Sequence, residues 1–137
     1  MKQLKPTKPT QEQSFFCKEN GITFDQFTGK TPMKGNIYLG FFEKVPKGFC
    51  VIIIGSLLLG SVEMVSEAFE PTVEGDLIMN EATELSKGFN PTVGGDLYLE
   101  SLESLPKLFR PNVGGAIFIK GRTVSSFKTP TKNKQIT

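Results

Sequence analysis

An internal repeat of twenty residues is the feature of this chain that most restricts its fold. The repeat runs without insertion through the body of the sequence, and each unit begins with a glycine. Such a period is typical of solenoid proteins, in which one unit buries its apolar side only against the next unit. It predicts a mainly β, single-domain repeat solenoid of about five coils over residues 35–119. The units begin at Gly35, Gly55, Gly75, Gly95 and Gly115.

Apolar residues recur at fixed positions of the unit and indicate which side chains face the core. Positions 3 and 5 are apolar and separated by one residue, which is the pattern of a strand with one buried face. Gly or Pro recurs in every unit and disfavours a long helix. We expect one short strand, a turn, a compact segment that ends at a phenylalanine, and a return segment. The expected inward columns are Ile37, Leu57, Leu77, Leu97 and Ile117; Leu39, Leu59, Met79, Leu99 and Ile119; Phe42, Val62, Ala82 and Leu102; Val45, Val65, Leu85 and Leu105; Phe49, Phe69, Phe89 and Phe109; and Ile53, Val73, Val93 and Val113.

The glycine at position 1 predicts a corner of the coil. Either the backbone there needs a positive φ, or neighbouring coils approach too closely to leave room for a Cβ.

The segment LYLESLESLP at residues 97–106 carries the pattern LxLxxLxxLP. In this pattern the chain resembles the short bacterial leucine-rich repeats, and the resemblance covers residues 35 to about 119. It departs from that family where an Asn or Cys is expected, because Phe42, Val62, Ala82 and Leu102 stand there. A straighter, β-helix-like solenoid is equally compatible. The resemblance implies no shared catalytic activity and a rigid scaffold whose exposed columns bind other macromolecules.

The segments outside the repeat differ from it in composition. Residues 1–14 predict a flexible polar tail, residues 15–34 an N-terminal cap, and residues 120–137 a C-terminal cap with a basic tail. Phe15, Phe16, Ile22, Phe24 and Phe27 supply the apolar surface of the N-terminal cap. Residues 1–13 are polar, so we expect no leader peptide there, and the two cysteines, Cys17 and Cys50, stand in unlike surroundings. We therefore expect a cytoplasmic protein with two reduced thiols.

The chemistry that the sequence offers is sparse. The chain has no His, which removes the usual general base and a common metal ligand, and its glycines form no phosphate-binding motif. Asp76 and Asp96 share position 2 and could stack as a carboxylate pair that holds a cation. Stabilisation of a turn beside glycine is the simpler interpretation of these aspartates. We expect no enzymatic activity, no metal and no cofactor.

Position 4 is apolar or aromatic in every unit, although it lies on the outward side of the expected strand. A contiguous apolar stripe there indicates a partner-binding surface or a dimer interface. Cross-strand packing on a half-exposed sheet explains the same pattern. The stripe consists of Tyr38, Leu58, Ile78, Tyr98 and Phe118.

Ile52 and Ile54 break their own columns, since polar residues or glycine stand at the equivalent positions of later units. They belong to CVIIIGSLLLG, residues 50–60, which lies in an uncharged stretch too short for a membrane span. We therefore add both isoleucines to the expected partner-binding surface.

These features favour a protein–protein binding module, with a second copy as one candidate partner. An inhibitor of a bacterial defence nuclease, similar to an anti-CRISPR protein of a phage or mobile element, is a narrower alternative. Basic tails around a body with a formal charge of −6 offer contact with nucleic acid or with a nucleic-acid-bound partner. A structural subunit of an assembly is the last alternative. The tail lysines are Lys2, Lys5, Lys8, Lys128, Lys132 and Lys134.

Overall fold

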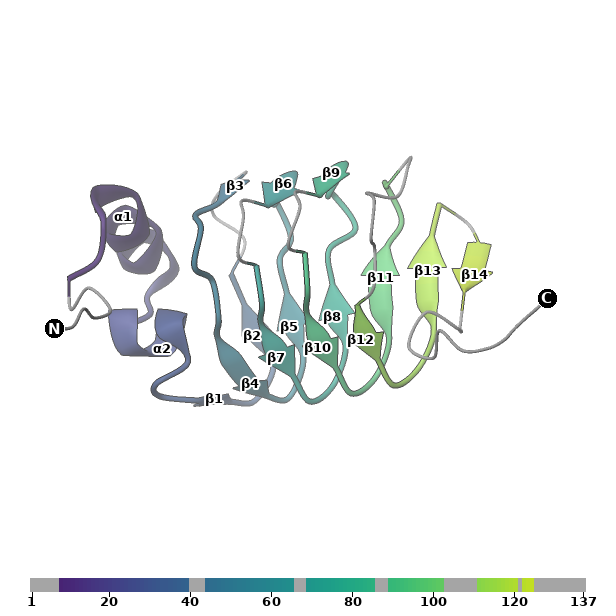
Figure 1. Ribbon diagram of the computed structural model, residues 1–137, viewed down its shortest axis with the longest axis horizontal. Helices are drawn as coiled ribbons and strands as arrows, with labels where there is room; N and C mark the ends of the chain where they lie inside the picture. Colours follow the sequence, from purple (N-terminus) through teal and green to yellow (C-terminus); the bar gives the residue numbers. More distant parts are fainter. Residues whose placement is uncertain are drawn as a thin grey trace, which may run out of the picture.

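The computed structural model describes residues 8–39, 44–65, 69–85, 89–102, 111–120 and 122–124. Parallel strands spaced twenty residues apart stack into a β-solenoid of about three turns. Figure 1 shows the helices at the N-terminal end of the stack and the last strand at the opposite end.

Three sheets form the sides of the stack, and all their strand pairs are parallel except β13–β14. Sheet A has the order β1-β4-β7-β10-β12, with β1 Met33–Lys34, β4 Ile52–Ile54, β7 Thr72–Val73, β10 Thr92–Val93 and β12 Asn112–Val113. Sheet B has the order β14-β13-β11-β8-β5-β2, with β2 Ile37–Tyr38, β5 Leu57–Leu58, β8 Leu77–Ile78, β11 Leu97–Leu99, β13 Ile117–Ile119 and β14 Arg122–Val124. Sheet C has the order β3-β6-β9, with β3 Lys44–Val45, β6 Met64–Val65 and β9 Glu84–Leu85.

The strand predicted at positions 3 to 5 is present as the strands of sheet B. The expectation of a single strand in each unit was wrong, because the turn region contributes sheet C and the return segment contributes sheet A. Most of these additional strands are two residues long. A pair of residues is too short to reveal an alternating pattern in sequence.

The inward columns lie where the repeat places them. The described members at positions 3 and 5 of sheet B are buried except Ile37, which is partly buried at the N-terminal end of the stack. Leu85 at position 11 is likewise only partly buried. The rings of Phe49 and Phe69 stack with centroids 5.4 Å apart, and those of Phe69 and Phe89 stack at 5.2 Å. Phe42, Leu105 and Phe109 lie outside the described residues.

The glycine corner exists for both of the predicted reasons. Gly35 and Gly55 have left-handed φ values of 99° and 148°. Close approach governs Gly95 and Gly115, where an added Cβ would lie 3.0 Å from the carbonyl oxygen of Gly75 and 2.9 Å from that of Gly95, respectively. A side chain at this corner would therefore push neighbouring coils apart.

Two helices precede the stack, and neither was predicted from the sequence. α1, Gln11–Asn20, and α2, Phe24–Thr28, each begin with a capping box and end at a left-handed glycine. The sequences TQEQ at residues 10–13 and TFDQ at residues 23–26 match the S/T-x-x-E/Q signal that could have revealed them. α1 crosses the expected boundary between residues 14 and 15.

The helices place apolar side chains over the first coil. The rings of Phe16 and Phe27 are fully buried and meet Phe49 edge to face at 5.8 and 5.6 Å. Phe15 was expected in this apolar surface but is 55% exposed. At the opposite end β14 pairs antiparallel with β13, so the chain reverses direction after the last parallel strand.

Candidate protein-binding surface

The stripe at position 4 forms one continuous column on the outer face of sheet B. Strand register places its members directly beside one another in the order Tyr38, Leu58, Ile78, Tyr98 and Phe118. Tyr38 is 51% exposed and Leu58 is 37% exposed, whereas the other three are partly buried. The side chains point outward because their strand neighbours at positions 3 and 5 fill the core.

Aromatic packing holds the two ends of the stripe. The rings of Tyr98 and Phe118 stack with centroids 4.8 Å apart and an interplanar angle of 17°. The Tyr38 ring lies over Gly60, where an added Cβ would come within 2.7 Å of the ring. Packing between neighbouring coils, the alternative explanation that the sequence left open, therefore accounts for the aromatic residues at the two ends of the stripe.

A ladder of hydrogen bonds runs beside the stripe at position 2. The Oδ1 atom of Asn36 accepts from the N–H of Ser56 at 3.2 Å, and the hydroxyl of Ser56 accepts from the N–H of Asp76 at 3.0 Å. The Oδ1 atoms of Asp76 and Asp96 accept from the N–H groups of Asp96 and Ala116, both at 2.8 Å. Every rung thus ties one coil to the next.

The sequence singled out Asp76 and Asp96 at position 2 but did not predict that the whole column forms a hydrogen-bond ladder. Asn, Ser and Asp share the ability to accept a hydrogen bond and little else, so this column shows no single residue type. The two aspartates stabilise the corner beside glycine. Among the described residues, no group of three or more metal-ligating side chains gathers.

The aspartates make the C-terminal half of the surface acidic. Burial raises the pKa of the Tyr98 hydroxyl, and the carboxylates of Asp96 and Asp76 raise it further, with a smaller effect from Glu100. The N-terminal half of the ladder is built from neutral Asn36 and Ser56.

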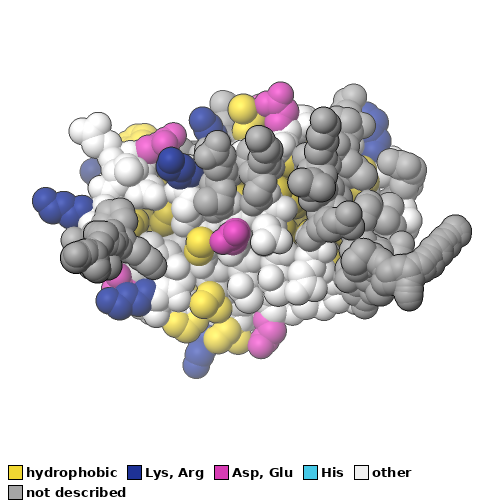
Figure 2. Space-filling model, in the orientation of Figure 1, with side chains coloured by type: hydrophobic (Ala, Val, Ile, Leu, Met, Phe, Trp, Pro, Cys, Tyr) yellow, Lys and Arg dark blue, Asp and Glu magenta, His cyan; other side chains and the backbone are white. Residues whose placement is uncertain are grey.

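Ile52 and Ile54 lie in β4 of sheet A, so they are not part of the stripe. Ile54 is 38% exposed, and Ile52 is partly buried beside Gly29 at the end of α2. Figure 2 shows hydrophobic side chains gathered on this face over the region of β1 and β4. The sequence-predicted surface is thus divided between two sheets.

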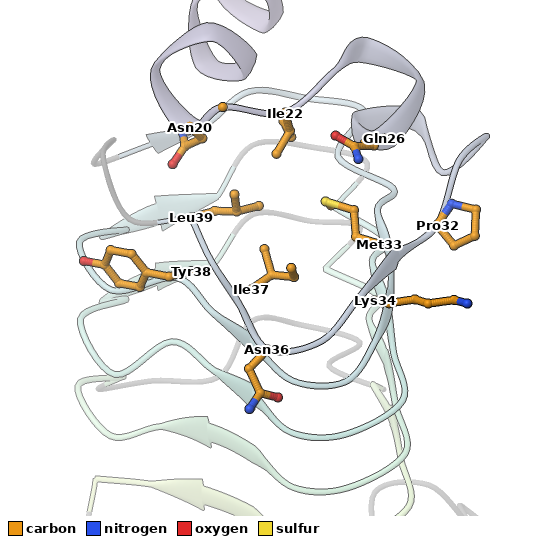
Figure 3. Close-up of a pocket in the computed structure, with 11 residues that line it drawn as sticks. Asn20, Ile22, Gln26, Pro32, Met33, Lys34, Asn36, Ile37, Tyr38 and Leu39 are labelled. Atoms are coloured by element: carbon orange, nitrogen blue, oxygen red, sulfur yellow. The ribbon is translucent and has the colours of Figure 1, made fainter.

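A pocket of about 460 Å³ opens between the helices and the first coil. Figure 3 shows Met33 of β1, Ile37 of β2 and Leu39, which follows β2, on the side of the first coil, with Ile22 and Gln26 of the helical segment above them. Lys34 points away from these apolar side chains. The pocket explains why Ile37 is only partly buried, whereas its counterparts in later coils are covered on both sides.

The remaining candidate residues contribute little to this surface. Cys17 is buried and Cys50 is partly buried, and burial raises the pKa of the Cys17 thiol to about 11. Lys8 is exposed, and the other tail lysines lie outside the described residues. Within the part of the chain that the structure describes, no helix is long and apolar enough to cross a bilayer.

Comparisons with protein-family models, with curated proteins and with solved structures found no significant match.

Proposed function

We propose that this protein is a non-enzymatic binding module that presents the outer face of sheet B to a protein partner. The supporting observation is the unbroken column of five outward apolar or aromatic side chains, which successive coils hold in register. Exposed apolar columns of this kind commonly mark interaction sites.

The rigidity of the solenoid supports the same function. Backbone hydrogen bonds and the position-2 ladder fix each strand of sheet B against its neighbours. A surface that is already ordered loses little conformational entropy when a partner binds, and this favours affinity.

Affinity capture with matched variants tests the proposal. The full chain, an Ile78→Asp variant and a Thr92→Asp variant are immobilised and exposed to lysate of the cell that produces the protein. Ile78 lies at the centre of the stripe, whereas Thr92 is exposed on sheet A, so the second variant is the matched control. We expect a partner that the wild type and Thr92→Asp retain equally and that Ile78→Asp loses. Circular dichroism establishes that all three chains are folded.

Equal capture by all three chains would refute the proposal for this face. Loss with Thr92→Asp alone would move the binding surface to sheet A, where Ile52 and Ile54 lie.

Several narrower features belong to the same proposal. Three short strands in a coil favour the β-helix-like form of the solenoid over the leucine-rich-repeat form. The five coils over residues 35–119 and the caps at residues 15–34 and 120–137 include residues 103–110 and 125–137, which lie outside the described residues. Inhibition of a defence nuclease, nucleic-acid binding through the tails, assembly as a structural subunit and a cytoplasmic location remain predictions from sequence.

A further inference from the structure

The outer face of sheet B is chemically polarised along the solenoid axis. Beside Tyr38 and Leu58, position 2 carries the neutral side chains of Asn36 and Ser56. Beside Ile78 and Tyr98 it carries the carboxylates of Asp76 and Asp96. The first two coils of the face are therefore neutral at position 2, the third and fourth are anionic, and Ala116 stands beside Phe118 in the last.

The negative charge exceeds what the ladder needs. Each rung requires one acceptor for one N–H, and the amide oxygen of Asn36 and the hydroxyl of Ser56 meet this need without charge. Like charges directly opposite each other on neighbouring parallel strands repel. A carboxylate accepts about four hydrogen bonds, so each aspartate keeps acceptor capacity for another donor. Arg and Lys are the donors that match such a carboxylate pair.

The size of the face restricts its partner. The five side chains of the stripe are separated by four intervals of about 4.8 Å, so the stripe is about 19 Å long. A stable interface between globular proteins buries about 800 Å² on each side, far more than one narrow column provides. The stripe therefore suits a single segment of a partner better than a second globular subunit.

The spacing of the rungs favours a helical segment over an extended one. A helix laid along the solenoid axis presents side chains at intervals of about 5.4 Å, close to the rung spacing of about 4.8 Å. An extended chain presents side chains on one face at intervals of about 6.7 Å, so they fall out of step with the coil spacing after fewer residues. About 13 helical residues cover the stripe.

We infer that the face binds a basic amphipathic helix, whose apolar side chains lie along the stripe and whose Arg or Lys side chains pair with Asp76 and Asp96. This inference rests on the proposed function and adds the class of partner. The placement of the cations follows, because they must lie beside the third and fourth members of the stripe, Ile78 and Tyr98, where Asp76 and Asp96 stand.

A peptide library displayed on phage tests the inference against the full chain. Each peptide has about 16 residues, with leucine fixed at helical spacing and the other positions varied among Lys, Arg, Glu, Gln, Ala and Ser. Selected peptides are measured against the wild type, the double variant Asp76→Asn, Asp96→Asn, and Ile78→Asp. Asparagine keeps the Oδ1 acceptor and therefore the ladder, while the charge is lost. Asp25→Asn, at an exposed site on α2, is the matched control.

We expect the selected peptides to carry basic residues toward one end. The double variant should weaken their binding about tenfold, whereas Asp25→Asn should change it less than about twofold. Added salt should reduce the difference between wild type and double variant, because it screens exposed charges. A central proline should abolish binding, since it breaks a helix.

Other results would overturn the inference in distinguishable ways. Equal binding to wild type and the double variant, with loss only in Ile78→Asp, would remove the charge recognition and leave the proposed function intact. Binding insensitive to all variants would refute both. A wild-type dimer that Ile78→Asp converts to a monomer, measured by light scattering, would identify a second copy as the occupant. Undiminished binding of proline-containing peptides would exclude the helical form.

Discussion

At the scale of single residues, the interior phenylalanine column carries more stability than the exposed positions that face water. Phe89 is buried and stacks on Phe69 at 5.2 Å, while Thr92 in the same coil is exposed. Phe89→Ala should lower the free energy of unfolding by about 3 to 5 kcal/mol, because it removes apolar burial and leaves a cavity. Thr92→Ala should change it by less than about 0.5 kcal/mol. Urea denaturation of both variants measures the difference, and equal losses would contradict the assignment of inward and outward columns.

Tyr98 reports the electrostatics of the acidic half of the surface. Burial and the nearby carboxylates raise its hydroxyl pKa, so the folded protein keeps this proton to higher pH than the unfolded chain does. Stability should therefore fall as the pH rises above the ordinary tyrosine value of about 10. In a Tyr38→Phe background, ultraviolet titration should show a lower Tyr98 pKa after Asp96→Asn. An unchanged titration would show that the carboxylate does not act on Tyr98.

The two thiols should differ in reactivity. The Cys17 thiol is buried and its pKa is raised to about 11, whereas Cys50 is only partly buried. The thiolate is the reactive form, so iodoacetamide at pH 8 should modify Cys50 well before Cys17. Mass spectrometry of peptides from the native protein measures both rates. Faster modification of Cys17 would contradict its burial on the core side of α1.

At the scale of elements, the position-2 ladder joins the strands of sheet B. Asp76→Ala removes the acceptor of the Asp96 N–H, which is partly buried, and should cost about 1 to 3 kcal/mol in unfolding free energy. Asp76→Asn keeps an acceptor in the same place and should cost less. Equal losses from the two variants in urea denaturation would show that the charge, and not the hydrogen bond, stabilises the ladder.

The elements also show what a single sequence can and cannot predict. The strands of sheet B were predictable because alternating apolar residues recur with an exact period and are flanked by glycine. Sheets A and C were not, because their strands are mostly two residues long and are specified by contacts between coils. The ladder was hidden because Asn36, Ser56 and Asp76 share a function without sharing a residue type.

The helices and the surface mark two further limits. The capping boxes at Thr10 and Thr23 are local sequence signals that could have predicted α1 and α2, although neither helix belongs to the repeat. The outward stripe followed from strand periodicity. The position of Ile52 and Ile54 on another sheet did not, because the angle between two sides of a coil is a property of the fold as a whole.

At the scale of the whole molecule, the binding surface exists only because successive coils stack in register. A shift of one residue in any strand would turn an outward side chain toward the core. The polarity of the face, neutral near the helices and anionic beside β8 and β11, likewise depends on the order of the coils along the axis.

The most direct test of this architecture is the distance between the two ends of the stripe. Nitroxide labels are attached at Tyr38→Cys and Phe118→Cys in a chain with Cys17→Ala and Cys50→Ala, and double electron–electron resonance measures their separation. The two positions are separated by four coil spacings of about 4.8 Å, which predicts a single distribution centred at about 19 Å whose width reflects only the label linkers. A broad distribution, or a separation beyond about 35 Å, would mean that the coils do not stack in this order and that the proposed binding surface does not form.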